Sequence, residues 1–216
     1  MTAHTVPEED STMTDSTWST LPNWKFRLFP RDTRTIVTCV FLGLLMAVFL
    51  QITERLDLAL TGGTVPIVSA VVVCAIWVPA SSFYGITGAL IVAWINPIIS
   101  NLTASQPLAP FLFVTNAAHT LPVALLVWLM KSRDRGLNLW QVLIIGQVGG
   151  ICDAIAFGFG NAIILHMPFN FIVGQILVVQ PAFVAGSFIT YIVMRRLLKT
   201  GLIAREREAS SAVGVV

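Results

Sequence analysis

A few polar and aromatic side chains that could bind a small solute lie within long apolar stretches of this chain. From Leu58 to Met130 there is no Asp, Glu, Lys or Arg, and from Gly136 to Met194 the only one is Asp153. Because a carboxyl, imidazole or amide group is costly against lipid, such groups are expected to face the interior of a helical bundle. The candidate ligand-binding residues are Trp94, Asn96, Asn116, His119, Asp153, Asn161, Gln175 and Gln180.

Each candidate also has a structural alternative. A lone carboxyl at membrane depth, such as Asp153, either contacts a ligand, couples protons or makes a structural hydrogen bond as a buried neutral acid. His119 could pair with a backbone carbonyl or with Asp153 instead of a ligand. Trp94 could serve as a membrane anchor, pack within the protein or stack on an aromatic ligand. The amides of Asn116, Gln175 and Gln180 could join helices by hydrogen bonds.

Motifs of catalysis and metal binding are missing from the sequence. There is no GxxxxGK[ST], no HExxH, no GxSxG with a triad and no His/Cys metal cluster. Cys39, Cys74 and Cys152 lie in apolar runs without CxxC spacing, as expected of small buried residues. The sequence therefore predicts no enzymatic activity, no cofactor, no metal site and no nucleic-acid partner.

The elements that must position these residues are membrane-spanning helices. The chain of 216 residues is 56% hydrophobic and 11% charged, with a mean hydropathy of +0.81, whereas globular chains are about 25% charged. Since a helix needs about 20 apolar residues to cross a bilayer, we expect an all-α integral membrane protein with six transmembrane helices in a compact bundle.

A tight turn is predicted at Pro79–Ser82, and a break near Asn96-Pro97. The predicted spans are Thr35–Thr53, Thr64–Pro79, Phe83–Ser100, Leu108–Met130, Leu137–Leu165 and Asn170–Leu198.

The basic residues predict the orientation of these helices. With the N-terminus inside, every Lys and Arg except Arg55 falls in a cytoplasmic segment. We therefore expect a protein of the plasma membrane with both termini on the cytoplasmic side.

Residues 1–23 are acidic and Ser/Thr-rich and are predicted to form a disordered tail. Residues 24–34 are basic and aromatic, as in an interfacial segment. Residues 35–199 form the predicted transmembrane domain, and 200–216 a cytoplasmic tail. In this orientation the strongly polar side chains gather in the outer halves of the spans, which predicts an outward-facing cavity enclosed by the third, fourth, fifth and sixth spans.

Small residues mark places where helices can approach closely. Gly43 and Ala47 form a small-xxx-small pair in the first span. They could pack against another helix of this chain or dock a partner subunit, and both alternatives stay open. The run Gly146–Gly150 in the fifth span predicts internal packing.

The chain shares several features with a known family of membrane proteins. These are its size, its six predicted spans, its two cytoplasmic termini, the Gly43/Ala47 pair and the absence of an ATPase motif. From about Arg34 to Lys199 it resembles the substrate-binding S component of an energy-coupling factor (ECF) transporter. The resemblance implies capture of a vitamin or related small molecule from outside, with energy supplied by a separate transmembrane T subunit and ABC ATPases. It implies that Gly43 and Ala47 contact the T subunit and that the loop containing Gly62-Gly63 is a gate. It also implies that the substrate-binding residues are Asn116, His119, Asp153, Asn161, Gln175 and Gln180. The supply of aromatic and amide groups would suit a heteroaromatic vitamin or an aromatic amino acid.

Two other functions fit the same residues. One is a stand-alone secondary transporter or channel, coupled to protons through Asp153. The other is a membrane scaffold subunit that transports nothing, in which the polar side chains pair with one another.

Overall fold

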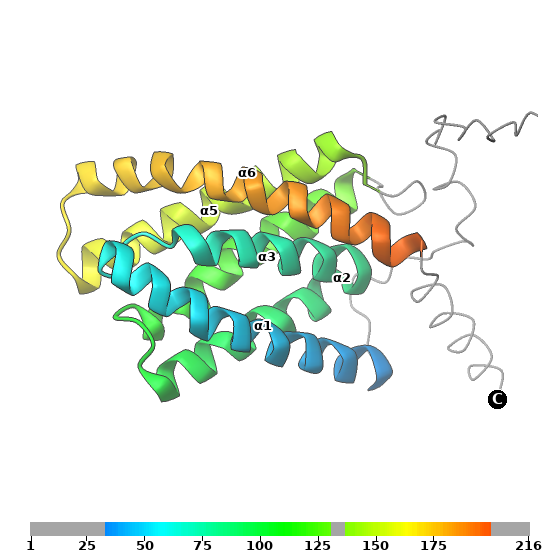
Figure 1. The fold of residues 1–216 in the computed structure, drawn as a ribbon, viewed down its shortest axis with the longest axis horizontal. Coiled ribbons are helices and arrows are strands. Elements are labelled where there is room, and N and C mark those ends of the chain that lie inside the picture. Colours follow the sequence, from blue (N-terminus) through cyan, green and yellow to red (C-terminus); the bar gives the residue numbers. More distant parts are fainter. Residues whose placement is uncertain (1–32, 131–136, 200–216) are drawn as a thin grey trace, which may run out of the picture.

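The computed structural model describes residues 33–130 and 137–199, and these residues form helices joined by short connections. The predicted tails at 1–23 and 200–216, and nearly all of the interfacial segment at 24–34, lie outside the described residues. The elements run in the order α1 (Thr33–Thr61), α2 (Ile67–Thr103), the short 3₁₀ helix η2 (Ala109–Phe111), α3 (Leu112–Leu129), α5 (Leu139–Ile164) and α6 (Phe169–Lys199), as Figure 1 shows.

Five of these helices are long and apolar enough to cross a membrane. Each of the five contains a continuous window of high hydropathy with few charges, and no strand occurs in the two described ranges. The prediction of an all-helical, membrane-embedded chain is confirmed at this level.

Helix α2 consists of two arms that run in opposite directions. Its backbone leaves the helical conformation at Gly85, where φ is 65° and ψ is −162°. The hydroxyl of Ser69, in the first arm, donates to Thr53 Oγ1 over 3.2 Å, and the hydroxyl of Ser100, in the second, donates to Glu54 Oε2 over 3.0 Å. A straight helix would separate Ser69 from Ser100 by about 46 Å, so the chain must reverse between them, as the ribbon does in Figure 1.

The reversal differs in position from the turn predicted at Pro79–Ser82, and that prediction is wrong. Residues 79–82 are buried inside the first arm, where Ser82 Oγ donates to the carbonyl of Val78 over 2.7 Å. A hydroxyl that bonds back to the preceding turn is compatible with a continuing helix. Gly85 has a positive φ, which glycine adopts at little cost, and it therefore provides the turn.

Two other predicted boundaries are also corrected. The first span was predicted to end at Thr53, but α1 continues to Thr61 because Glu54 and Asp57 are buried against α2. The break predicted near Asn96-Pro97 is absent, and the second arm of α2 continues to Thr103. Asn101 Nδ2 donates to the carbonyl of Pro97 over 2.7 Å, which satisfies an acceptor in the last turns of the helix.

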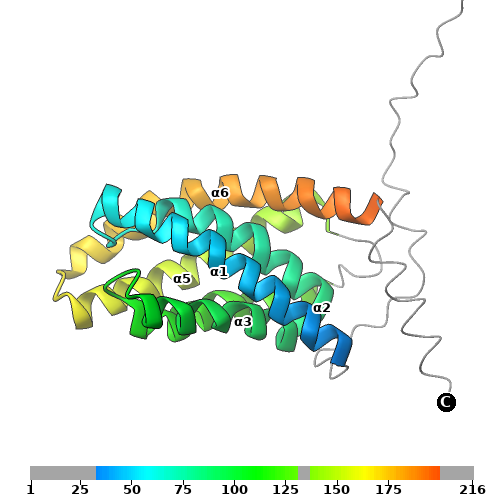
Figure 2. The ribbon, with the colours of Figure 1, turned by 60° about the horizontal axis from the view of Figure 1, so that its bottom comes forward.

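Helix α1 buries one stripe of side chains and leaves an apolar face exposed. The stripe packs against α2, the chief neighbour of α1, and Figure 2 shows α1 lying along the outside of the bundle. Phe41 and Val48, on the opposite face, are largely exposed, as expected of a helix that faces lipid. The buried stripe consists of Cys39, Gly43, Met46, Ala47, Leu50, Thr53, Glu54 and Asp57.

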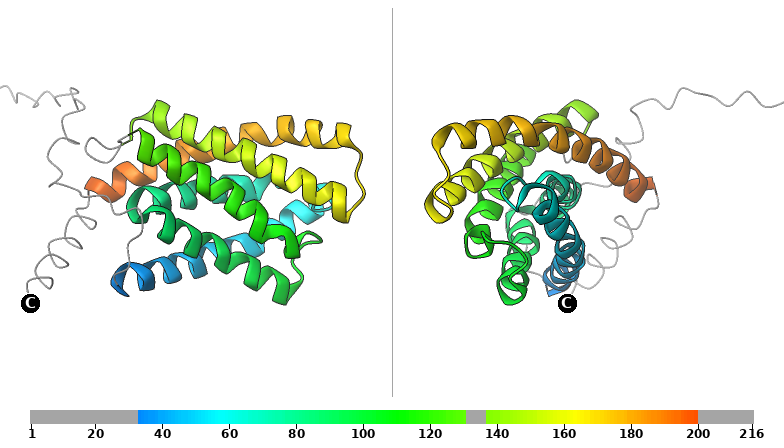
Figure 3. Two further views of the ribbon diagram at one scale, coloured as in Figure 1. Left: turned by 180° about the vertical axis from the view of Figure 1, so that it is seen from behind. Right: turned by 60° about the vertical axis from the view of Figure 1, so that its left-hand side comes forward.

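Helices α3, α5 and α6 complete the bundle through close contacts. Helix α5 packs on both α3 and α6, and its run along α3 is visible in the left view of Figure 3. A Cβ atom added at Gly150 would collide with the ring of Phe183, and one at Gly149 would lie 2.9 Å from His119 Nε2. The predicted internal packing of the Gly146–Gly150 run is therefore confirmed. Helix α5 begins with a capping box, in which the side chain of Asn138 accepts from Gln141 N and the side chain of Gln141 accepts from Asn138 N.

Candidate functional site

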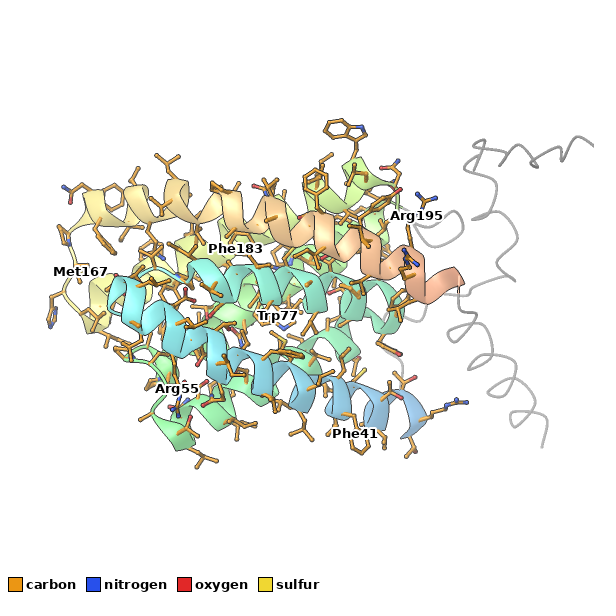
Figure 4. The ribbon with its side chains drawn as sticks, in the orientation of Figure 1. Phe41, Arg55, Trp77, Met167, Phe183 and Arg195 are labelled. Carbon is orange, nitrogen blue, oxygen red and sulfur yellow. The ribbon has the colours of Figure 1, made fainter. Side chains whose placement is uncertain are left out.

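Polar side chains gather at one end of the bundle. This end, which we name the distal end, carries the connections at residues 62–66 and 104–108. It lies opposite the start of α1 and the last turns of α6. In Figure 4, Arg55 and Met167 lie toward the distal end and Arg195 lies at the other.

A cavity of about 40 Å³ lies beneath the two distal connections. We name it the polar cavity. It has room for a few water molecules. Helices α1, α2, α3 and α5 contribute its walls, together with Gly63 and Pro66 from one connection and Gln106 from the other. None of its lining residues is basic, whereas three are acidic: Glu54, Asp57 and Asp153.

The carboxylate of Glu54 is surrounded by hydrogen-bond donors. Its side chain is only 5% exposed. Asn96 Nδ2 donates to Oε1 over 2.8 Å, Ser100 Oγ donates to Oε2 over 3.0 Å, and the hydroxyl of Ser105 also donates to Oε2. These donors come from the second arm of α2 and the connection after it, so Glu54 fixes that arm against α1. Three donors offset part of the cost of burying a carboxylate.

Asp57 caps the first arm of α2 from a neighbouring helix. Its Oδ1 accepts from Val68 N over 2.7 Å, and its Oδ2 accepts from Ser69 N over 2.9 Å. The residue before α2, Pro66, provides no side-chain cap of its own. A carboxylate beside the free N–H groups of a helix start is favourable, because those groups carry partial positive charge.

Asp153 differs from the other two carboxyls, because none of the residues described by the structure donates a hydrogen bond to it. It is 7% exposed and lines the polar cavity from α5. Trp77 lines the same cavity from α2 and is 1% exposed, and its indole nitrogen has no partner among the described residues. Asp153 is therefore an acceptor in the cavity wall without a described donor, and the buried indole N–H of Trp77 is a donor without a described acceptor.

Three of the eight candidate residues from the sequence meet at the polar cavity: Asn96, Asn116 and Asp153. Asn96 is held by Glu54. Asn116 Nδ2 donates to the carbonyl of Ala93 over 2.6 Å. This hydrogen bond joins α3 to α2, which is the structural role that the sequence offered as the alternative to ligand binding. The cavity differs from the expected one, because α1 and the first arm of α2 form part of its wall and α6 contributes no lining residue.

Two further candidates join the distal connection to the bundle. Asn161 Nδ2 donates to the carbonyl of Thr64 over 2.9 Å and to Gln175 Oε1, also over 2.9 Å. Asn161 and Gln175 are buried. They thereby tie the 62–66 connection, which contains the proposed gate Gly62-Gly63, to α5 and α6. Both glycines have positive φ values, 65° and 74°, so the sharp bend there depends on their identity.

The remaining three candidates lie apart from the cavity. His119 is fully buried beneath it, with its ring centroid 4.8 Å from that of Trp77 and 5.6 Å from that of Phe183. Both of its nitrogens lack a partner in the described part of the chain. Gln180 is half-buried and its amide is likewise without a described partner. Trp94 is 43% exposed on the outside of the second arm of α2.

Gly43 and Ala47 are both buried within this chain. A Cβ atom added at Gly43 would lie 3.2 Å from the Cα of Val92, so the backbones of α1 and α2 approach closely there. Ala47 is fully buried. Of the two alternatives left open by the sequence, internal packing accounts for both residues.

Glu54 and Asp57 were missed as site residues by the sequence analysis. They were assigned to the end of the first span because charges usually mark the membrane boundary. The signal that could have identified them is their spacing. Gly43, Ala47, Leu50, Glu54 and Asp57 continue a single helical stripe at intervals of three and four residues. Arg55 lies on the opposite face of α1, where its side chain is exposed, whereas Glu54 and Asp57 are buried.

The described residues contain no group of three His, Cys, Asp or Glu side chains that could hold a metal ion. Comparison of the chain with protein-family models, with curated proteins and with solved structures gave no match.

Proposed function

We propose that this chain is the membrane-embedded substrate-capture subunit of an ECF-type uptake transporter, and that it performs no catalysis itself. The observation that carries the proposal is the polar cavity at the distal end. Its lining residues come from four helices and two connections, and one of these residues, Asp153, is an acceptor without a described donor. A solute entering from the distal side would meet these groups first.

The proposal includes six membrane crossings, with each arm of α2 counted as one. Each arm is about 27 Å long at 1.5 Å per residue, close to the hydrocarbon thickness of a bilayer. Arg34 at the start of α1 and Arg195 and Arg196 near the end of α6 would then lie on the cytoplasmic side, and Arg55 on the outer side. The distal end would face outward from the plasma membrane.

A vitamin-sized solute needs more room than the cavity provides, since ligand sites commonly enclose about 300–1,000 Å³. We therefore propose that the connection at 62–66 moves to admit it. Gly62 has open space around it, with no atom within 4 Å of an added Cβ. The hydrogen bond from Asn161 to Thr64 would then hold the connection in the closed position.

Docking to the T subunit would use other residues than Gly43 and Ala47, which pack internally. All five long helices expose apolar side chains that can face lipid or a partner subunit, and the outer face of α1 is one of these surfaces.

The test is to purify the tagged protein from its native membrane in mild detergent, with gentle crosslinking, and to identify co-purifying proteins by mass spectrometry. The proposal predicts a larger membrane subunit together with ABC-type ATPases. Repeated isolation of the chain alone under crosslinking would contradict it.

A proton-coupled secondary transporter is the second candidate, and the unpaired position of Asp153 favours it. A single carboxyl at membrane depth that faces a cavity is a common place for proton coupling. This candidate predicts solute uptake into vesicles driven by a proton gradient in the absence of any ATPase. It also predicts loss of that uptake in Asp153→Asn.

A further inference from the structure

The polar cavity contains three carboxyl groups whose surroundings differ. Glu54 receives hydrogen bonds from three side chains, and Asp57 from two backbone N–H groups at the start of α2. Asp153 receives none from the described residues, and no basic side chain lines the cavity. Of the three, Asp153 is the carboxyl free to bind an incoming group.

A second, independent feature is the buried indole N–H of Trp77, whose side chain forms part of the cavity wall. This side chain is 1% exposed, and its nitrogen has no partner within the described ranges. Because an indole N–H can only donate, an occupant of the cavity that pairs with it must carry an acceptor. Buried polar atoms without partners are uncommon in folded proteins, and a bound ligand or water is one ordinary explanation.

From these two features we infer that the polar cavity takes the head of a small organic ammonium compound that also carries a hydrogen-bond acceptor. The ammonium group donates to Asp153, and the acceptor, a hydroxyl, ether or carbonyl oxygen, receives the indole N–H of Trp77. A cationic donor complements a carboxyl group that has no basic neighbour in the cavity, because hydrogen bonds between charged partners are the strong ones. A cavity of about 40 Å³ accommodates a group of a few non-hydrogen atoms without rearrangement.

This inference rests on the proposed function for the route by which the solute arrives, but its chemistry can be tested on the isolated chain. The probe is ethanolammonium, which combines an ammonium group with a hydroxyl. Its matched neutral counterpart is ethylene glycol, which has the same number of non-hydrogen atoms. Thermal unfolding of the full chain in mild detergent is followed at equal millimolar concentrations of either compound, with sodium chloride as the control for ionic strength and for inorganic cations.

Ethanolammonium is expected to raise the unfolding temperature in a saturable way, because a ligand that binds the folded state stabilises it. Ethylene glycol and sodium chloride are expected to leave that temperature unchanged. An equal response to ethylene glycol or to sodium chloride overturns the inference. This comparison uses the unaltered protein, so it does not depend on whether a variant folds.

Asp153→Asn, which has nearly the same shape, is expected to weaken the apparent affinity for ethanolammonium about tenfold or more, since one charge-assisted hydrogen bond is lost. Gln147→Leu on the same helix is the matched control, because it removes a half-buried amide that does not line the cavity, and it should keep the affinity of the unaltered chain. Unchanged affinity in Asp153→Asn overturns the inference. If a T subunit co-purifies but ethanolammonium stabilises the chain no more than ethylene glycol does, the inference is wrong and the proposed function stands.

If the chain purifies alone but ethanolammonium stabilises it selectively, the proposed function is wrong and the inference stands.

Discussion

The Oε1 atom of Glu54 accepts a hydrogen bond of 2.8 Å from Asn96 Nδ2, which joins α1 to the second arm of α2 across 42 positions of sequence. Both side chains are buried and both line the polar cavity. The contact therefore has a structural and a functional consequence. It fixes the angle between two helices, and it determines where one wall of the cavity lies.

Glu54→Ala should lower the free energy of unfolding by about 3 kcal/mol, because it leaves the donors of Asn96, Ser100 and Ser105 without their acceptor. The measurement is reversible unfolding in mixed detergent micelles. A double-mutant cycle with Asn96→Ala should give a coupling energy of about 1.5–3 kcal/mol. The control cycle pairs Glu54→Ala with Ser187→Ala on α6, where the effects should simply add. Additive behaviour in the Asn96 cycle would refute a direct interaction.

Asp57→Ala should destabilise the protein by about 1–2 kcal/mol, the usual effect of losing a helix N-cap. Asp57→Asn keeps one acceptor oxygen and is expected to fall between the alanine variant and the unaltered chain. Leu56→Ala, on the exposed side of the same turn, serves as the control and should change stability little. Equal stabilities of Asp57→Ala and Leu56→Ala would show that the contact to α2 has no capping role.

Gly150→Ala should destabilise the bundle by about 1–3 kcal/mol, because its added methyl group collides with the ring of Phe183. Gly174 on α6 offers a matched comparison, since no atom lies within 4 Å of an added Cβ there. Gly174→Ala should stabilise the protein by about 0.5–1 kcal/mol through the better helix propensity of alanine. The measurement is the free energy of unfolding of both variants. A larger loss of stability in Gly174→Ala than in Gly150→Ala would contradict the packing described for α5 and α6.

The proposed six crossings can be tested by labelling single cysteines in intact cells with a maleimide that does not cross membranes. Thr33→Cys and Arg196→Cys lie at exposed positions near the start of α1 and the end of α6. Pro168→Cys lies at an exposed position in the connection between α5 and α6. Six crossings predict that Pro168→Cys reacts in intact cells, whereas the other two react only after the membrane is opened. Reaction of Thr33→Cys and Arg196→Cys on opposite sides would exclude an even number of crossings.

The sequence predicted the helical class and most of the helices, because long uncharged runs are specific to membrane segments. It failed where burial of a charge depends on another helix. Glu54 and Asp57 are acceptable inside α1 because donors from Asn96, Ser100 and the start of α2 reach them. Those donors lie far away in the sequence, so a local hydropathy pattern could not reveal them.

The predicted cavity is a similar case. The sequence identified Asn96, Asn116 and Asp153, which meet at the polar cavity, because a polar residue in an apolar run stands out. It could not separate them from Asn161 and Gln175, which hydrogen bond to each other, or from His119, which packs between Trp77 and Phe183. The residue types are alike, and only the tertiary arrangement distinguishes a side chain that lines the cavity from one that lies elsewhere in the bundle.

The most direct test of the central claim, that the polar cavity binds a solute, is to extract small molecules from the protein purified out of its native membrane. The extracts are compared by mass spectrometry between the unaltered chain, Ala70→Phe and Gly174→Ala. Ala70 is buried in the wall of the cavity, so the larger side chain should fill it, whereas Gly174 lies in open space. The account predicts a compound enriched with the unaltered chain and with Gly174→Ala but lost from Ala70→Phe. The same compounds in equal amounts from all three proteins, each folded by its unfolding curve, would contradict it.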